Sequence, residues 1–203
     1  MKTCKNNRIS VALMLTFCLL MNHSSLVLAD AKADGDKGIA EFKNGNLIES
    51  MRLLEKSAEA GYAPAQVTLA YILDQSERNS EAFKWYQQAA DANDAAGLLG
   101  LGGMYAKGEG TTADPQKAGR LIERSALQNH LPGMRAYAHA LEYGQLGFVP
   151  DGSAAAEWYL KAANAGDGVS MQRLKDAYAS GQLGLPVDPE QAAKWDAKIN
   201  EGN

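Results

Sequence analysis

Cysteine is nearly absent from this sequence of 203 residues: the only two, Cys4 and Cys18, lie within the first 29 positions. Residues 30–203 therefore offer no disulfide, no thiolate nucleophile and no cysteine ligand for a metal. A chain of this length can bury a hydrophobic core without disulfides. We therefore expect a fold that is stabilised by packing alone.

The side chains of common catalytic and metal sites are also scarce. After residue 29 only His130 and His139 remain as histidines, and His139 with Glu142 would give at most two ligands on one helical face. The glycines of Gly108 and Gly110 are not followed by Lys-Ser or Lys-Thr, and no Gly-x-Ser-x-Gly motif occurs. Acidic residues are scattered along the chain. We expect no enzymatic activity, no metal and no cofactor.

The first 29 residues have the layout of a secretory signal. Lys2, Lys5 and Arg8 precede an apolar run over residues 9–21, and small or apolar residues lead up to Ala29. The run is short for a membrane span. We predict cleavage after Ala29, a periplasmic or secreted protein, and no membrane span in the mature chain. An uncleaved signal anchor is the alternative.

The charge of the mature chain restricts its partners. Removing residues 1–29 takes three of the 20 basic residues and none of the 24 acidic ones, which leaves 17 basic residues and a formal charge of −7. An acidic surface repels phosphate groups. The sequence therefore disfavours nucleic acid and anionic membranes as partners.

The chain contains an internal repeat of 32 to 37 residues. Helical patterns end at four Gly or Asn residues, which tolerate the left-handed backbone of a helix end, and a fifth copy runs to the C-terminus. The four ends are Gly61, Asn93, Asn129 and Gly166. A period of this size is typical of stacked helical hairpins. We number positions within each repeat from these ends.

Each repeat predicts one buried stripe on each of its two helices. On the first helix, position 4 is small and positions 8 and 12 are large or apolar, which is the spacing of one helical face. On the second helix a small residue is followed by a large one three positions later. The large residues are Leu53, Trp85, Leu121, Trp158 and Trp195. Pairs of Ser or Ala follow four positions after the first four of these.

The third repeat contains the motifs Leu101-Gly102, Tyr105, Gly108-Glu109-Gly110, Asp114-Pro115, Lys117-Ala118 and Ser125-Ala126, and the fourth contains Trp158 and residues 161–166. These motifs resemble the Sel1-like repeat family, which is related to the tetratricopeptide repeat. The resemblance implies an all-α fold, a right-handed superhelical α-solenoid of about five helix-turn-helix repeats. We place the signal at 1–29 and the repeat domain at 30–203. The expected repeats are about 30–61, 62–93, 94–129, 130–166 and 167–203.

The related tetratricopeptide fold implies that positions 3, 6, 10, 13 and 14 of each first helix face a concave surface. The candidate partner-binding residues at such positions are Tyr71, Asp74, Lys107, Arg135, His139, Glu142, Tyr143, Gln172 and Asp176. Among these, Arg135, His139 and Tyr143 are spaced by four residues and form one ridge. Arginine and tyrosine are frequent anchors of interfaces. The alternative is an ordinary solvated face on which Arg135 pairs within the protein.

Three classes of function are compatible with these features. The leading hypothesis is a scaffold or adaptor that binds a protein or peptide through the concave face. The second is an accessory of envelope machinery that binds peptidoglycan or polysaccharide, with Tyr71 and Tyr143 stacking on sugar rings. An enzyme is the third and least favoured. Trp195 and Ile199 in the last helix either form a docking patch or pack onto the preceding hairpin, and packing is favoured.

Overall fold

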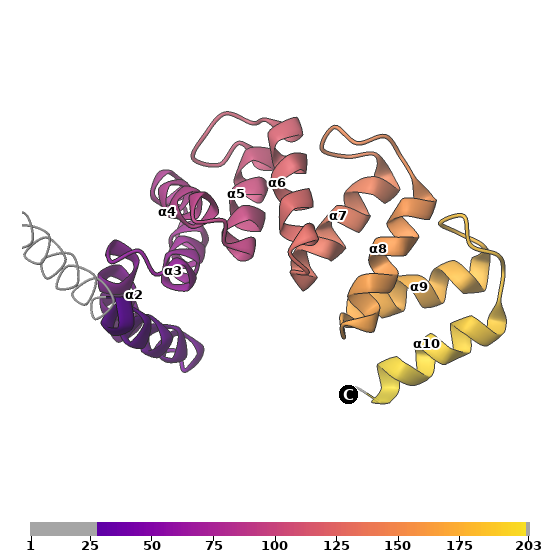
Figure 1. Ribbon diagram of the computed structural model, residues 1–203, viewed down its shortest axis with the longest axis horizontal. Coiled ribbons are helices and arrows are strands. Elements are labelled where there is room, and N and C mark those ends of the chain that lie inside the picture. The colour runs from indigo at the N-terminus through magenta and orange to yellow at the C-terminus, as the bar shows by residue number, and fades with distance from the viewer. Residues whose placement is uncertain (1–27, 202–203) are drawn as a thin grey trace, which may run out of the picture. The chain divides into compact units, whose positions relative to one another are not determined.

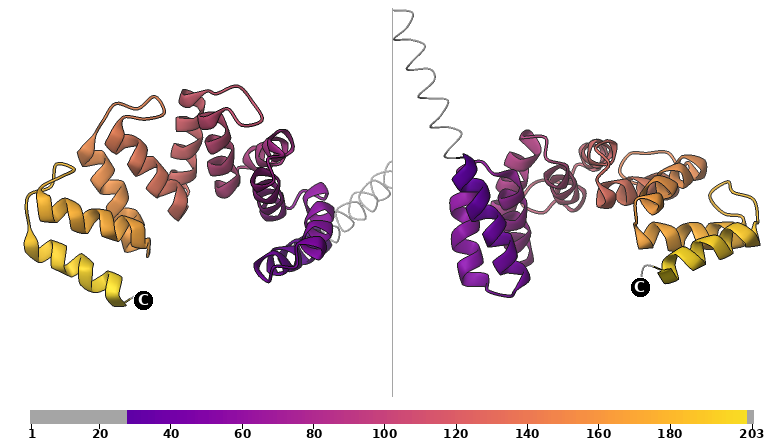
Figure 2. Two further views of the ribbon diagram at one scale, coloured as in Figure 1. Left: turned by 180° about the vertical axis from the view of Figure 1, so that it is seen from behind. Right: turned by 60° about the horizontal axis from the view of Figure 1, so that its bottom comes forward.

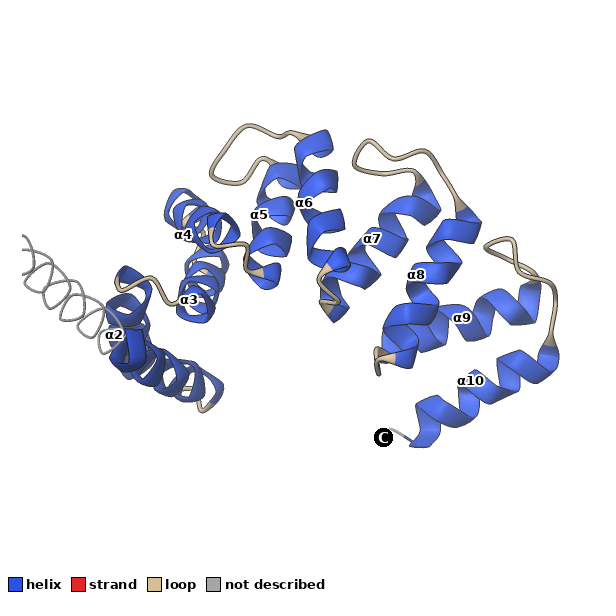
Figure 3. Cartoon of the chain, viewed as in Figure 1, coloured by secondary structure: helices blue, strands red, loops and turns tan. Residues whose placement is uncertain are grey.

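The computed structural model describes residues 28–201, and every regular element within this range is a helix (Figure 3). The expected all-α repeat architecture is confirmed. The predicted signal segment, except for its last two residues, lies outside the described range. Among the described helices none is both long and apolar enough to cross a membrane.

The helices follow one another in pairs of similar length (Figure 1). Helical residues 28–43 come first. They are followed by α2 (Leu47–Glu59), α3 (Ala63–Gln75), α4 (Asn79–Asp91), α5 (Ala95–Lys107), α6 (Pro115–Leu127), α7 (Leu131–Tyr143), α8 (Gly152–Asn164), α9 (Gly168–Ser180) and α10 (Pro189–Glu201). The chain divides into two compact units, residues 1–69 and 70–203, and the division falls within α3.

The first unit has a small core between its helices. Leu53 and Leu54 of α2 are 3% and 0% exposed, and Ala65 of α3 is fully buried. The hydroxyl of Ser50 is also buried and donates to the carbonyl oxygen of Gly38 over 2.9 Å. This bond satisfies a polar group that would otherwise destabilise the core.

The second unit is a row of helical hairpins. Within hairpins α5 packs on α6, α7 on α8 and α9 on α10, and between hairpins α4 packs on α5, α6 on α7 and α8 on α9. The connection from α3 to α4 is short, whereas residues 108–114, 144–151 and 181–188 form longer loops. These loops close their hairpins at the ends opposite the short turns that join α6 to α7 and α8 to α9, as the view from behind also shows (Figure 2).

Two of the long loops also contact the preceding hairpin. A side chain at Gly119, near the start of α6, would lie 2.4 Å from the carbonyl oxygen of Leu146 in the next long loop. In the same way, a side chain at Gly152 would lie 3.1 Å from the backbone of Leu183. Each of these loops therefore packs against the preceding second helix, and the glycines make room for it.

The buried stripe of the first helices is confirmed. Positions 4, 8 and 12 are buried in α3, α5 and α7, and in α9 only the last of them, Tyr178, is partly exposed. The backbone at Asn93 and Asn129 is left-handed, with φ of 59° and 60°. The sequence therefore located both the packed face and the helix ends correctly.

The predicted stripe of the second helices is shifted by one residue in two repeats. Trp85 and Trp158 are only partly buried, whereas the residues that follow them, Tyr86 and Tyr159, are 7% and 3% exposed. Successive residues of a helix are rotated by about 100°. The residue four positions after the small one therefore points to the middle of the buried face, between the small residue and the pair seven and eight positions after it. The residue three positions after the small one points to the edge of that face. Trp158 at this edge packs edge-on against Tyr137, with ring centroids 5.2 Å apart.

Aspartate caps begin three of the second helices. Asp114 and Asp151 each accept a hydrogen bond from the backbone N–H three residues on, and Asp188 accepts from the backbone N–H groups two and three residues on. Asn46 at the start of α2 makes no such bond to the helix backbone. Its side chain donates to the carboxylate of Glu41 instead.

Two glycines of α5 predict opposite responses to the same substitution. A Cβ atom at Gly97 would lie 2.5 Å from the Cβ atom of Ala89 and 2.9 Å from the backbone of α4, so Gly97→Ala should cost about 1–2 kcal/mol of unfolding free energy. Nothing lies within 4 Å of a Cβ atom at Gly103, so Gly103→Ala should stabilise the protein by about 0.5–1 kcal/mol. Urea unfolding followed by circular dichroism measures both. Equal effects at the two positions would contradict the close approach of α4 and α5.

Candidate functional site

Four of the predicted residues line one pocket in the second unit. Arg135, His139, Glu142 and Tyr143 follow one another along α7, and the pocket between them and α9 has a volume of about 530 Å³. The remaining lining residues are Leu99, Pro132, Ala136, Tyr159, Val169 and Arg173. We call this site the α7–α9 pocket. Four of these ten residues are aliphatic and three are aromatic, and the charged groups come from α7 and α9.

An ion pair between α7 and α9 forms one wall. A terminal nitrogen of Arg173 lies 2.6 Å from Glu142 Oε1, and its Nε lies 3.1 Å from the same oxygen. Tyr159 of α8 donates its hydroxyl to Glu142 Oε2 over 3.0 Å. The Glu142 side chain is 8% exposed and that of Arg173 is 20% exposed. The carboxylate is therefore buried behind its guanidinium partner.

Burial and hydrogen bonding shift the pKa of the Glu142 carboxylate in opposite directions. Burial alone would raise the pKa of Glu142, but the hydrogen bonds from Arg173, Tyr143 and Tyr159 outweigh it and lower the pKa. Burial, followed by the charge of Glu142, raises the pKa of Tyr159. Glu142 is thus held as a carboxylate and Tyr159 as a neutral donor. A carboxylate with these partners is poorly suited to act as a general base.

A second ion pair joins the start of the pocket to α9. Arg135 contacts Asp167 Oδ1 over 2.7 Å, and the exposed fractions of the two side chains are 38% and 10%. Asp167 Oδ2 accepts from the backbone N–H and the hydroxyl of Ser170, so Asp167 also caps α9. The alternative in which Arg135 pairs within the protein is therefore what the structure shows. The guanidinium nevertheless remains partly exposed at the pocket.

An exposed aromatic pair forms the rim. The rings of His139 and Tyr143 lie one turn apart on α7, with centroids 4.6 Å apart and an interplanar angle of 48°. Tyr143 is 55% exposed. Its hydrogen bond to Glu142 raises the pKa of the phenol. The rim therefore presents two aromatic rings, tilted relative to one another, next to charged groups.

The other predicted residues lie outside this pocket. Tyr71 is 46% exposed. Burial raises the pKa of Tyr86, and the nearby charges of Asp74 and Tyr71 raise it further. Lys107 forms an ion pair with Glu109 over 3.2 Å. Gln172 donates to Asp176 over 2.9 Å on the exposed face of α9. The α7–α9 pocket thus includes fewer than half of the nine predicted residues.

Sequence reasoning missed Ala136, Arg173 and Tyr159. Ala136 and Arg173 both occupy position 7 of their repeats, which was not among the expected groove positions. A signal was available, because position 7 is four residues after position 3 and three before position 10 and so shares their helical face. Tyr159 reaches the pocket from a second helix, and the one-residue shift of that stripe hid it.

The two histidines considered as metal ligands lie apart from any suitable cluster. The Ser125 hydroxyl donates to the carbonyl of Ala95 over 2.7 Å and lies 2.9 Å from His130 Nδ1, so Nδ1 carries the hydrogen of that contact. Burial lowers the pKa of His130 more than nearby Asp94 raises it. Residues 28–201 contain no group of three or more His, Cys, Asp or Glu side chains placed to hold a metal.

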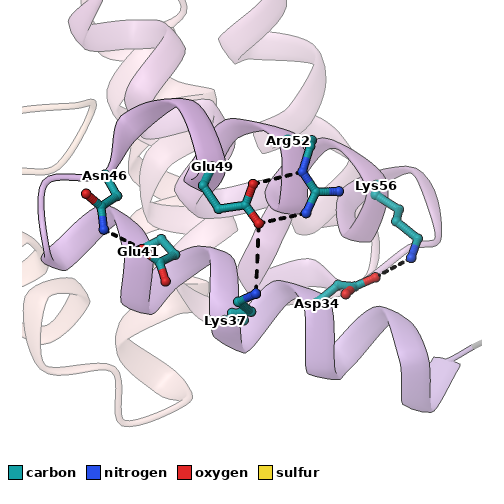
Figure 4. Close-up of polar contacts among 7 residues, drawn as sticks. All are labelled: Asp34, Lys37, Glu41, Asn46, Glu49, Arg52 and Lys56. Carbon is teal, nitrogen blue, oxygen red and sulfur yellow. Dashed lines mark hydrogen bonds and ion pairs between the residues drawn. The ribbon is translucent and has the colours of Figure 1, made fainter.

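The charged face of the first unit differs from the pocket (Figure 4). Glu49 accepts from Arg52 over 2.7 Å and lies 3.9 Å from Lys37, and Lys56 lies 2.6 Å from Asp34. Opposite charges therefore neutralise one another along the two helices. Such exposed pairs are worth little and leave no dominant charge for a partner.

The last helix is packed as the favoured interpretation expected. Trp195 is 6% exposed and belongs to one hydrophobic cluster with residues of α6 to α9, among them Tyr159 and Leu174. Ile199 is partly buried. Trp195 is therefore part of the core of the second unit.

The comparisons with known proteins agree with this architecture. The Sel1 repeat model matches residues 28–62, 63–94, 95–130, 131–167 and 175–195. An uncharacterized protein of Neisseria meningitidis serogroup B is 32% identical over 136 residues, which make up 66% of this chain and 29% of that protein. This chain therefore spans less than a third of that relative.

Two solved structures share the fold. A Sel1 repeat protein from Oxalobacter formigenes aligns with a TM-score of 0.76 and 26% identity over 83% of this chain and 70% of that one. A protective antigen of uropathogenic Escherichia coli that displays an SLR fold aligns with a TM-score of 0.66 and 28% identity, over 84% of this chain and 38% of that one. Sel1 repeats form helical scaffolds that typically mediate protein interactions. From its five matched repeats and its paired helices, the chain belongs to the Sel1 repeat family.

Proposed function

We propose that this protein is a non-enzymatic scaffold that binds a protein or peptide partner in the α7–α9 pocket, in the periplasm or outside the cell. The observation that supports this most is the composition of the pocket. Aliphatic side chains of Leu99, Pro132 and Val169 share one concave site with exposed aromatic rings and partly exposed guanidinium groups. Tyrosine and arginine are enriched among the residues that contribute most to binding at protein interfaces.

The location rests on the sequence of the first 29 residues, which has the features of a secretory signal. Mature chain purified from the periplasm or the medium should begin at Asp30. N-terminal sequencing of that protein tests the location. A mature chain that retains residues 1–29 would contradict it.

The proposed binding site is tested by a substitution that fills the pocket. Val169 is 59% exposed at the start of α9 and lines the pocket, so Val169→Trp should obstruct it without disturbing the core. Val187 is 64% exposed in the last long loop and does not line the pocket, which makes Val187→Trp the matched control. Tagged full-length protein and both variants are used to capture binding proteins from envelope extract.

A protein retained by the wild type and by Val187→Trp, but lost with Val169→Trp, would support the proposal. Its direct binding to the purified chain is then measured by fluorescence anisotropy. Equal retention by both variants would exclude the α7–α9 pocket as the site. It would leave the scaffold function, which another surface would then serve.

A second candidate is a glycan partner, and the exposed pair of His139 and Tyr143 favours it. Aromatic faces in such an arrangement can stack on sugar rings. Sedimentation with purified peptidoglycan tests this candidate with the same two variants. Binding of peptidoglycan that Val169→Trp abolishes, with no protein captured, would favour the glycan over the peptide.

A further inference from the structure

The ion pairs of the α7–α9 pocket expose their hydrogen-bond donors more than their acceptors. The carboxylates of Asp167 and Glu142 are 10% and 8% exposed, and their oxygens accept from Arg135, Ser170, Arg173 and Tyr159. Their guanidinium partners are 38% and 20% exposed. An occupant therefore meets the cationic side of both ion pairs.

Unused donors remain on both arginines. A guanidinium has five N–H groups. Within the described residues, Arg135 donates only to Asp167, through one terminal nitrogen, and Arg173 donates only to Glu142, through Nε and one terminal nitrogen. The remaining N–H groups match the planar oxygens of a carboxylate. An acceptor-rich, negatively charged group is therefore the natural complement of this wall.

The rest of the molecule limits how much negative charge the occupant can carry. The whole sequence has a formal charge of −4, and residues 30–203 are more acidic still. A strongly acidic chain or a polyanionic glycan would be repelled at long range. A single carboxylate beside an apolar group avoids most of this repulsion and still uses the short-range contacts.

The spacing along α7 matches an extended peptide. Arg135 and His139 are one turn apart, which is about 6 Å along the helix axis. In an extended segment, residues i and i+2 lie on one face about 6.5–7 Å apart. A carboxylate at Arg135 would thus place a side chain two residues away near Ala136, His139 and the aliphatic wall.

We infer that the occupant of the α7–α9 pocket is an extended peptide segment in which one aspartate or glutamate lies two residues from an aliphatic side chain. This inference rests on the proposed function and specifies its ligand. The carboxylate binds the free N–H groups of Arg135, and the aliphatic side chain packs against Leu99, Ala136 and Val169. Tyr143 and His139 cover the peptide from the rim.

The test uses short peptides and nuclear magnetic resonance of the full-length chain labelled with nitrogen-15. The probes are acetyl-Glu-Ala-Leu-amide, its reverse acetyl-Leu-Ala-Glu-amide, acetyl-Gln-Ala-Leu-amide and acetyl-Glu-Ala-Ser-amide. We expect one of the two acidic leucine peptides to shift resonances of α7 and α9. It should bind about fivefold more tightly than the Gln or the Ser peptide, as one partly exposed charge-assisted contact allows.

A variant and its control assign the preference to Arg135. Arg135→Gln should remove the difference between the Glu and Gln peptides, and its thermal midpoint reports whether the fold is kept. Arg120→Gln removes the same charge from an exposed position on α6 outside the pocket, and it should preserve the difference. A preference that survives Arg135→Gln would overturn the assigned contact.

The possible outcomes separate this inference from the proposed function. If the Gln peptide binds α7 and α9 as tightly as the Glu peptide, the acidic requirement is wrong while the pocket still binds peptides. If polygalacturonate binds more tightly than any peptide, the occupant is an anionic glycan and the inference is overturned. If no probe shifts α7 or α9 and Val169→Trp loses no partner, both the inference and the proposed site fail.

Discussion

Replacing Tyr159 with alanine should reduce the free energy of unfolding by about 3–5 kcal/mol. The ring is 3% exposed within the hydrophobic cluster of the second unit, and its hydroxyl donates to Glu142. The substitution removes both the packing of the ring and one of the hydrogen bonds that hold the carboxylate. Urea unfolding followed by circular dichroism measures the loss.

The neighbouring residue provides the matched control. Trp158 is larger than Tyr159 but only partly buried, with Tyr137 on one side and the Lys161 ammonium 4.0 Å from its ring centroid. Trp158→Ala should therefore cost less, about 1–2 kcal/mol. If Trp158→Ala proves more destabilising than Tyr159→Ala, the register of α8 is wrong.

A milder substitution separates the two contributions of Tyr159. Tyr159→Phe keeps the packed ring and removes the hydroxyl, so it should cost about 1 kcal/mol. Since Glu142 would keep its bonds to Arg173, the α7–α9 pocket should retain its shape. The difference between the Phe and Ala variants then measures the packing of the ring.

Much of the fold was predictable because each repeat carries the same local signals. Left-handed ends at Asn93 and Asn129, caps at Asp114 and Asp151, and a small-large stripe at fixed spacing all agree with one period. Such agreement between local and global patterns is what specifies a fold. The prediction for Trp158 is wrong because the size of an aromatic residue does not by itself place it at the centre of the buried face. Helix geometry places Tyr159 there instead.

The candidate site was only partly predictable because its charges are paired between repeats. Arg135 in α7 and Asp167 before α9 lie 32 residues apart in the sequence, and Glu142 and Arg173 lie 31 apart. The repeat predicts that these segments are neighbours but not which side chains meet. The aromatic and cationic ridge on α7 was visible from spacing alone. The partners that hold it, and the exposure left to each arginine, depended on packing.

Among substitutions at the site, we expect Arg173→Met to cause the second largest loss of unfolding free energy. Arg173→Met keeps most of the side-chain volume but leaves Glu142, which is 8% exposed, without its cation. Removing one partner of a buried pair is costly because the other charge stays uncompensated. Since Arg173 itself is 20% exposed and water can replace part of its contact, we expect a loss of about 2–4 kcal/mol at neutral pH. The double variant Arg173→Met/Glu142→Gln should recover most of this loss.

The dependence of this loss on pH identifies its cause. In the wild type the pKa of Glu142 is lowered, so its contribution to stability is present above the unfolded pKa of about 4.3 and is lost as the pH falls through the folded value. In Arg173→Met the hydrogen bonds from Tyr143 and Tyr159 remain, but the hydrogen bond and the charge of the guanidinium are gone, and we expect burial to raise the folded pKa of Glu142 above that of the unfolded chain. The penalty would then be largest at neutral pH and would diminish as Glu142 takes up a proton.

Unfolding free energies measured from pH 7 to pH 4 should therefore converge for Arg173→Met and the wild type. Those of the double variant should remain parallel to a Glu142→Gln reference, because neither chain carries the titrating group. A loss in Arg173→Met that is independent of pH would mean that Arg173 stabilises the hairpins through its aliphatic contacts and not through the charge of Glu142.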